Sequence, residues 1–128
     1  MLQRLPQNSA DAAGGADTTP VLEAHDLVKV YPNGGVTAVD HVSLSIDRGS
    51  YVSIMGPSGS GKSTLLNLLG GLDTPTSGEV RFRGTPYADF DSLDKLRSSH
   101  LGFVFQSFHL LPTLSVLENV QVPMFELP

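Results

Sequence analysis

The order of hydrophobic and polar residues from Val21 onward predicts a small antiparallel sheet at the start of the fold. Every second residue of this run is apolar, with one aspartate among them, which is the pattern of a half-buried strand. These residues are Leu22, Ala24, Asp26, Val28 and Val30. Residues 31–35 (YPNGG) then give a strong turn signal. Residues 36–39 and 42–46 are again rich in β-branched side chains, which predicts two returning strands.

After a turn at residues 47–49, the pattern predicts strands that alternate with helices. Residues 51–55 (YVSIM) form a short apolar run, which indicates a buried strand. Four leucines then have helical spacing and predict a helix packed on a core: Leu65, Leu66, Leu68 and Leu69. Residues 70–78 should end this helix, and residues 79–82 alternate as a further strand before a turn at residues 83–84.

The last third of the chain predicts one more helix and one more strand before its end. Residues 91–99 indicate a short polar helix with Leu93 and Leu96 on its buried side. Residues 101–105 (LGFVF) predict a buried strand that ends at Gln106.

A helix start is also predicted near residue 115. Ser115 and Glu118 have the spacing of a capping box, and Pro123 should end the helix at about Gln121. Strands that alternate with helices, after an antiparallel start, predict an α/β domain.

The strongest motif is residues 56–64 (GPSGSGKST), which fill the pattern G-x-x-x-x-G-K-[ST]. Its three glycines lack Cβ atoms, so backbone N–H groups can turn inward and cradle the oxygens of a polyphosphate. Lys62 supplies a mobile positive charge for the β- and γ-phosphates, and the hydroxyl of Ser63 can coordinate Mg²⁺. The alternative is a chance glycine-serine linker, which a preceding strand and a following helix disfavour.

Composition narrows the function classes further. The 128 residues carry a formal net charge of -5, which excludes broad electrostatic affinity for nucleic acid. The chain has no cysteine, so disulfides, thiol catalysis and cysteine-zinc sites are excluded. No apolar run approaches the roughly 18 residues of a membrane span. Residues 1–20 lack periodic apolar positions and are expected to be a disordered leader, which leaves residues 21–128 for the fold.

Three features together resemble a known family. Tyr31 ends the first strand, the phosphate loop follows at residues 56–64, and Gln106 comes directly after a buried strand. This order resembles the nucleotide-binding domain of ABC transporters, from Val21 to about Pro123. Two stretches, GLDTPTSG (71–78) and FVFQSFHLLP (103–112), resemble the branch with lipoprotein-release, macrolide-export and cell-division-type ATPases.

The resemblance implies ATP and Mg²⁺ as cofactors. It implies that Tyr31 stacks on adenine; the alternative is an aromatic side chain at a strand end that packs on the core. It implies that Gln106 contacts Mg²⁺ or the attacking water; the alternative is a polar residue that caps a strand. The catalytic residues would be Lys62 and Gln106, and the Mg²⁺ contacts Ser63 and Gln106. The expected nucleotide contacts are Tyr31, Gly56, Pro57, Ser58, Gly59, Ser60, Gly61, Lys62, Ser63 and Thr64.

The resemblance also implies a transmembrane permease subunit and a second ATP-binding subunit as partners, at the cytoplasmic side of the plasma membrane. Four apolar residues lie where the family docks a coupling helix of the membrane subunit: Phe105, Phe108, Leu110 and Leu111. For Phe105 and Leu111 a role in the core is the alternative. For Phe108 and His109, partner contact and no contact are equally open.

Four family features do not occur in these residues: the Leu-Ser-Gly-Gly-Gln signature loop, the Mg²⁺-binding aspartate after a strand, its neighbouring catalytic glutamate and the switch histidine. The expected fold is therefore a P-loop NTPase core with a small antiparallel β-subdomain, truncated before the helical signature region is complete. The complete protein would couple ATP hydrolysis to export or lipoprotein release. These residues alone are not expected to turn over ATP, because a positioned general base contributes about 10²–10⁴ in rate.

Two alternative functions each fit part of the sequence. A non-hydrolytic module that binds ATP, or only the transporter partner, remains open. A small kinase or GTPase fits less well, because no Asn-Lys-x-Asp guanine motif occurs. The histidines lack metal-ligand spacing: His25, His41, His100 and His109. Asp89, Asp91 and Asp94 are expected to cap and solvate a helix start rather than bind a metal.

Overall fold

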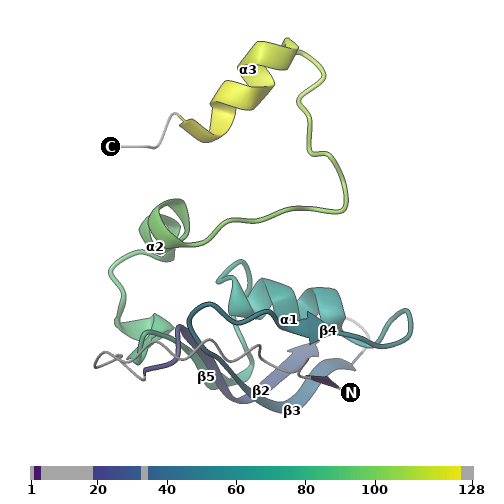
Figure 1. Cartoon of the computed structure of the whole chain (residues 1–128). Helices are drawn as coiled ribbons and strands as arrows, with labels where there is room; N and C mark the ends of the chain where they lie inside the picture. The colour runs from purple at the N-terminus through teal and green to yellow at the C-terminus, as the bar shows by residue number, and fades with distance from the viewer. Residues whose placement is uncertain (1, 4–18, 33–34, 125–128) are drawn as a thin grey trace. The chain divides into compact units, whose positions relative to one another are not determined.

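The computed structural model describes residues 2–3, 19–32 and 35–124, which fall into two compact units, Met1–Phe90 and Asp91–Pro128. Within the described residues, the first unit contains a four-stranded sheet, a two-stranded sheet and the helix α1 (Figure 1). The second unit contains the short helices α2 and α3.

The larger sheet is antiparallel throughout, with the strand order β3-β2-β5-β6. Its strands are β2 (Leu22–Tyr31), β3 (Val36–Ile46), β5 (Ser77–Phe82) and β6 (Thr85–Pro86). A two-residue turn joins β5 to β6, and both of its residues have positive φ, 49° at Arg83 and 80° at Gly84. Such turns match the twist of the flanking strands. The predicted antiparallel start is confirmed, and the predicted strand at residues 79–82 is confirmed and extended.

Two β-bulges correct the predicted pattern of β2 and β3. Asp26 on β2 has a φ of 50° and is an extra residue between the pairs Ala24↔Leu44 and Leu27↔Val42. Because a bulge shifts the parity, Leu27 rather than Val28 is fully buried. His41 has a φ of 47°, so residues 36–46 form one bulged strand instead of the two predicted strands.

The two bulges are joined by a side-chain hydrogen bond, which yields a pH prediction. His41 Nδ1 lies 2.8 Å from Asp26 Oδ1, and this carboxylate raises the pKa of His41 above its ordinary value of 6.5. The stabilisation is therefore fully present below about pH 6.5 and is lost as the pH rises through the folded pKa. We expect Asp26→Asn to lower the pKa of His41 in an NMR titration.

Asp40→Asn is the matched control, because Asp40 lies 4.0 Å from the other ring nitrogen and contributes least to the shift. An unchanged pKa of His41 in Asp26→Asn would contradict the prediction.

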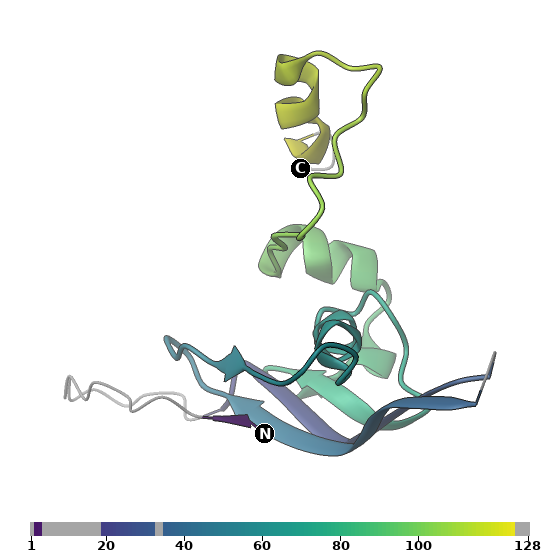
Figure 2. The same ribbon diagram turned by 90° about the vertical axis from the view of Figure 1, so that its right-hand side faces the viewer.

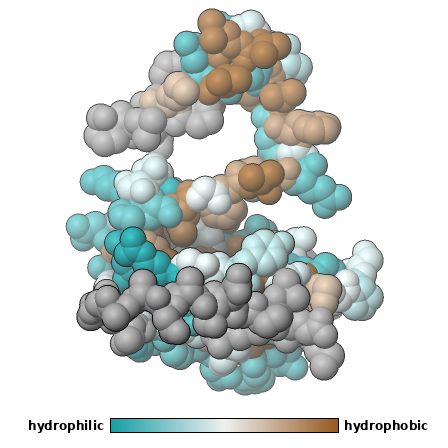
Figure 3. All heavy atoms as spheres, in the orientation of Figure 1, coloured by the Kyte–Doolittle hydropathy of each residue, from teal (hydrophilic) through white to brown (hydrophobic). Residues whose placement is uncertain are grey.

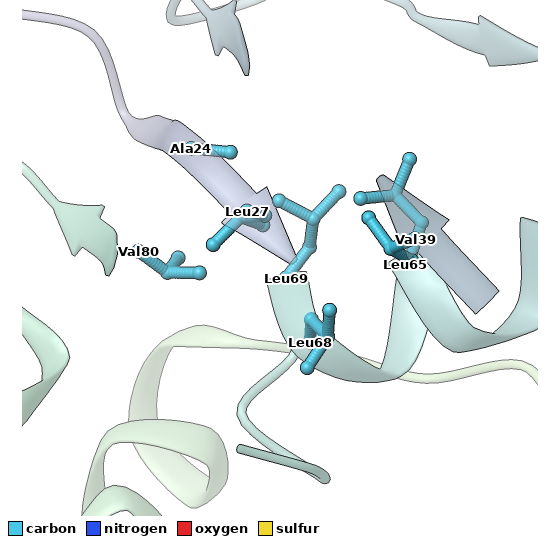
Figure 4. Close-up of a cluster of buried hydrophobic side chains, with 7 residues drawn as sticks. All are labelled: Ala24, Leu27, Val39, Leu65, Leu68, Leu69 and Val80. Atoms are coloured by element: carbon cyan, nitrogen blue, oxygen red, sulfur yellow. The ribbon is translucent and has the colours of Figure 1, made fainter. Parts of the chain in front are cut away.

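Helix α1 (Lys62–Leu69) packs on the larger sheet and closes the core. The buried cluster consists of Ala24, Leu27, Val39, Leu65, Leu68, Leu69 and Val80, drawn in Figure 4. Three of the four predicted leucines belong to it, whereas Leu66 is 54% exposed. The reason is helical geometry, since positions i, i+3 and i+4 share one face and i+1 does not.

The two-stranded sheet differs from the prediction for residues 51–55. Only Ser53 and Ile54 form a strand, β4 (Ser53–Ile54), and it pairs antiparallel with β1 (Leu2–Gln3). Tyr51 is 76% exposed, because no parallel strand flanks this run within the described residues. The pair β1–β4 also places a short strand inside the predicted leader, of which Met1 and residues 4–18 lie outside the described residues.

The second unit begins with α2 (Leu93–His100), which confirms the predicted polar helix. Ser92 caps it by accepting a hydrogen bond from the Lys95 N–H, and Leu96 is buried. Of the three aspartates predicted to cap and solvate the helix start, Asp94 lies in the first turn, Asp91 precedes the helix and Asp89 ends a separate 3-10 helix (Tyr87–Asp89). The capping residue is Ser92 instead. Helix α3 (Val116–Gln121) has the predicted capping box and ends at Gln121, where η2 (Val122–Met124) follows.

The predicted buried strand at residues 101–105 does not form. These residues have no regular structure, and Phe105 is half exposed. An apolar run becomes a buried strand only when neighbouring strands supply both hydrogen bonds and cover. The described residues of this unit contain no such neighbour. Apolar side chains gather instead on the surface of α3 and the segment before it, brown in Figure 3.

Candidate phosphate-binding site

The predicted phosphate loop lies between β4 and α1, in the first unit, where Figure 2 shows it leading into the helix. Gly61 is the N-cap residue of α1 and has a φ of 82°, in the left-handed region that glycine alone enters without strain. Lys62 is the first residue of the helix. The strand-loop-helix order expected from the motif is therefore present.

The loop packs closely against β3 because Gly61 has no side chain. A Cβ atom on Gly61 would lie 1.9 Å from the carbonyl oxygen of Ala38. Ala38 is itself an extra residue on β3, between the pairs Lys29↔Val39 and Val30↔Thr37. A bulge of this kind frees a strand carbonyl from regular pairing. At Gly56 a Cβ atom would lie 2.6 Å from Ser60 Oγ, a side-chain atom that can rotate away, so Gly61 is the more constrained of the two glycines.

The ammonium group of Lys62 lies over the loop. It donates hydrogen bonds to the carbonyl oxygens of Gly56 at 2.9 Å and Pro57 at 2.7 Å, and to Ser60 Oγ at 3.3 Å. Carbonyl oxygens are weaker partners for an ammonium group than phosphate oxygens, because they carry no net charge. The positive charge is thus held at the loop while remaining able to exchange partners.

The N-terminus of α1 supplies further donors. Within the described residues no side chain caps this end, and its first turn holds no acidic residue. The first N–H groups of a helix have no partner inside the helix, and they favour an anion. Ser63 and Thr64 lie in this first turn, with Ser63 exposed. A glycine that admits no Cβ, a lysine and helical N–H groups without a partner inside the helix fit a polyphosphate. The Ser63 hydroxyl fits a hard cation such as Mg²⁺.

A cavity of about 460 Å³ adjoins the loop. Gly56, Pro57, Ser60, Gly61 and Lys62 line it from the loop side. Residues of β3 line the other side, among them Ala38, Val39 and Asp40. The loop therefore borders an open space large enough for part of a small molecule.

Tyr31 occupies the end of β2, opposite Val36 on β3. Its hydroxyl donates to Asp73 Oδ2 at 3.0 Å, and the ammonium of Lys29 lies 5.1 Å from its ring centroid. Tyr31 is 37% exposed, so part of its surface is open to a ligand. The sequence did not assign any function to Lys29 or Asp73, although Asp73 lies in the turn 71–78 that supported the family resemblance.

Gln106 belongs to the second unit, in the irregular segment between α2 and α3. The fold of the first unit therefore does not bring Gln106 to the loop with Lys62 and Ser63. Near it, the rings of Phe103 and Phe105 stack at 5.8 Å, and Phe105 contacts the His109 ring at 4.8 Å. Phe108 is 90% exposed. Phe105 and Leu111 are both exposed, which contradicts the alternative of a core role for them.

The segment before α3 folds onto that helix through Asn119. Its side chain accepts from the Leu111 N–H at 2.8 Å and donates to the carbonyl oxygens of Leu111, Leu114 and Ser115. An apolar groove of about 300 Å³ results, lined by Leu110, Leu111, Pro112, Leu114, Val116 and Val120 together with Asn119. Leu110 and Leu111, two of the side chains predicted to meet a membrane partner, thus line this preformed groove.

No helix in residues 2–3, 19–32 and 35–124 combines the length and apolarity needed to cross a membrane. In the same residues, no group of three or more His, Cys, Asp or Glu side chains is arranged to hold a metal ion.

A strand, a glycine loop and a helix that begins at the loop lysine, beside an antiparallel sheet, define the class of P-loop NTPase folds. A family profile described as ABC transporter matches residues 39–126. The chain belongs to the ABC transporter family.

Known relatives support this membership. The macrolide export ATP-binding/permease protein MacB of Shigella flexneri is 50% identical over 109 residues, which are 82% of this chain and 17% of that protein. The lipoprotein-releasing system ATP-binding protein LolD of Alcanivorax borkumensis is 47% identical over 112 residues, which are 84% of this chain and 49% of that protein. The chain thus spans about half of LolD and about a sixth of MacB.

Solved structures agree with the fold. The dimeric, post-hydrolysis structure of the ATP-binding cassette MJ0796 bound to ADP and Pi has a TM-score of 0.74 at 47% identity, covering 80% of this chain and 46% of that chain. The structure of cbiO1 from Clostridium perfringens, part of the transporter complex cbiONQ, has a TM-score of 0.57 at 32% identity, covering 63% of this chain and 32% of that chain. The predicted family, branch and fold class are confirmed.

Proposed function

We propose that this chain binds ATP with Mg²⁺ at residues 56–64 and serves as the ATP-binding part of an ABC transporter for export or lipoprotein release. One observation carries the proposal. The Lys62 ammonium is held over the carbonyls of Gly56 and Pro57 by a loop whose Gly61 leaves no room for a Cβ atom. Similarity to MacB and LolD supports the transport function.

The chain's own residues divide the work of binding. Backbone N–H groups of residues 58–61 and of the first turn of α1 would hold the phosphate oxygens. Lys62 would exchange its carbonyl partners for the β- and γ-phosphates, and Ser63 would contribute its hydroxyl to Mg²⁺. When bound, Mg²⁺ neutralises negative charge on the phosphates. Gln106 would complete the site when the second unit carries it to the loop.

Binding and turnover are separable in this proposal. Residues 1–128 contain no signature loop and no glutamate beside a strand-end aspartate. Phosphoryl transfer depends on positioning and charge stabilisation, and a general base contributes about 10²–10⁴ in rate. We propose that these residues bind ATP with little hydrolysis, and that hydrolysis requires the elements of a complete ATP-binding domain.

A membrane partner and a second ATP-binding subunit belong to the proposal as well. The groove between α3 and the segment before it, and the exposed side chain of Phe108 in that segment, support docking of a permease subunit. MJ0796 is dimeric in its solved structure, which supports pairing with a second ATP-binding subunit. The location that follows is the cytoplasmic side of the membrane, through the permease.

Titration calorimetry with Mg-ATP tests the proposal. We expect Lys62→Ala to weaken ATP binding about 10- to 100-fold, because it removes a charge-assisted contact of about 1.5–3 kcal/mol. Lys95→Ala is the matched control, since Lys95 is an exposed lysine on α2 outside the loop. Equal affinities of the wild type and Lys62→Ala would refute binding at this loop.

Phosphate release measured on the same samples decides between the two functions left open. Lys62-dependent turnover in the 128-residue chain would show that these residues suffice for hydrolysis, contrary to the proposal. ATP binding without turnover in the 128-residue chain, with turnover in a chain joined to a complete set of family motifs, would support it. Binding without turnover in both would favour a non-hydrolytic module.

A further inference from the structure

The loop formed by residues 72–76 joins the phosphate-loop helix to the end of β2. The N–H groups of Leu72 and Asp73 donate to the carbonyl of Asn67 on α1, at 2.8 and 3.2 Å. At its other end, Thr76 N donates to the Val28 carbonyl at 2.7 Å, and Thr76 Oγ1 accepts from the Val30 N–H at 3.0 Å. The loop is therefore fixed at both ends by backbone hydrogen bonds.

Asp73 divides its carboxylate between two side chains of β2. Oδ1 accepts from Lys29 Nζ at 2.6 Å, and Oδ2 accepts from the Tyr31 hydroxyl at 3.0 Å. Lys29 also donates to the Thr74 carbonyl at 2.7 Å and lies 5.1 Å from the Tyr31 ring centroid. The hydroxyl and one face of the Tyr31 ring are thus both held in place.

This cluster is more buried than a typical surface ion pair. The side chain of Lys29 is only 13% exposed and that of Asp73 only 28%. The Lys29 ammonium lowers the pKa of Asp73, and the Thr74 N–H and the Tyr31 hydroxyl act in the same direction. Asp73 is therefore ionised near neutral pH, and its carboxylate can accept hydrogen bonds from Lys29 and Tyr31 at the same time.

We propose that Asp73 and Lys29 are positioning residues that hold the Tyr31 ring as a platform for the base of the nucleotide whose phosphates occupy residues 56–64. This inference rests on the proposed function. The expected ligand class is a purine nucleoside triphosphate, because a wide purine overlaps most with a phenol ring.

The strand register supports a single ligand that reaches both places. Tyr31 lies opposite Val36, and Ala38, two residues further along β3, is the residue whose carbonyl contacts Gly61. Two residues of a strand span about 7 Å. The platform and the phosphate loop therefore adjoin neighbouring positions of one strand, within the reach of a nucleoside triphosphate.

The chemistry of the ring fits the same ligand. An ammonium near one face of an aromatic ring is attracted by its π-electrons, so it fixes the ring without covering both faces. The residue keeps 37% of its surface exposed, which leaves area for a stacked base. A fixed ring loses less rotational freedom when the base binds, so positioning should raise affinity for the base alone.

Comparison of Mg-ATP with Mg-tripolyphosphate tests the inference, because tripolyphosphate offers the phosphates without a base. We expect Tyr31→Ala to weaken ATP binding about 10-fold, the scale of one stacked base, with tripolyphosphate binding unchanged. Asp73→Asn should weaken ATP binding about 3- to 10-fold, the scale of one hydrogen bond, and leave tripolyphosphate binding unchanged. Asp91→Asn, an exposed aspartate outside the cluster, is the matched control.

A double-mutant cycle shows whether Asp73 acts through Tyr31. The variant Tyr31→Phe removes only the hydroxyl that Asp73 holds, so its effect on ATP affinity should not multiply with that of Asp73→Asn. Multiplying effects, or an equal loss of tripolyphosphate binding, would overturn the positioning role. If Asp73→Asn fails to fold, Tyr31→Phe still tests the positioning role. Unchanged ATP affinity in Tyr31→Phe would overturn that role by itself.

The outcomes separate this inference from the function on which it rests. Loss of both ligands in Lys62→Ala, with ATP affinity unchanged in Tyr31→Ala, would overturn the platform and leave the phosphate site standing. A wild type that binds neither ligand would overturn both.

Discussion

Replacing Leu68 with alanine is expected to destabilise the first unit by about 2–5 kcal/mol. Leu68 is fully buried, between α1 and the larger sheet, in a cluster of seven side chains. Its truncation leaves a cavity that the surrounding side chains fill only in part. The loss is large because the total stability of a domain is only about 5–15 kcal/mol. Urea unfolding followed by circular dichroism measures the effect as a lower midpoint.

Leu66→Ala is the matched control on the same helix. Leu66 is 54% exposed, so its truncation should change stability by less than about 0.5 kcal/mol. Similar losses in both variants would show that the two leucines are equally buried in solution, which would place α1 differently on the sheet.

Replacing Gly61 with alanine is expected to abolish measurable ATP binding and to lower stability. The new Cβ would lie 1.9 Å from the Ala38 carbonyl oxygen, so either the loop or β3 must move. The left-handed φ of 82° adds a cost of roughly 1–2 kcal/mol. The measurements are calorimetric titration with Mg-ATP and urea unfolding.

Gly59→Ala separates steric conflict from backbone strain. Gly59 also has a positive φ, 79°, but nothing lies within 4 Å of its Cβ position. Gly59→Ala should therefore lower the stability by only the roughly 1–2 kcal/mol that backbone strain costs. ATP binding should be weakened but still measurable. If Gly61→Ala behaves like Gly59→Ala, the close approach of Gly61 to β3 is not needed for binding.

Local signals in the sequence determined much of the secondary structure. The capping box at Ser115 and Glu118 and the helix stop near Gln121 are confirmed because caps and prolines act within a few residues. The turn at Arg83 and Gly84 is confirmed for the same reason. The glycine loop and the helix after it are confirmed as structure, while the nucleotide contacts of residues 56–64 stay a prediction.

The failures share a different cause, since they concern strands. Residues 51–55 and 101–105 are apolar enough for buried strands, yet burial depends on which strands lie beside them. The bulges at Asp26 and His41 depend on how β2 and β3 pair along their length. Pairing between distant segments leaves no local signal in either segment, so periodicity alone placed Val28 rather than Leu27 in the core.

The sequence by itself determined the family, the phosphate loop and the helices α1, α2 and α3, because each is encoded in a motif or in the spacing of neighbouring residues. Only the tertiary structure decided which residues adjoin the loop. It brings the Ala38 carbonyl against Gly61. It also sets Asp73 between Lys29 and Tyr31, which lie 44 and 42 residues before Asp73 in the sequence. Such contacts arise when the α1 helix docks on the sheet, and no local pattern records them.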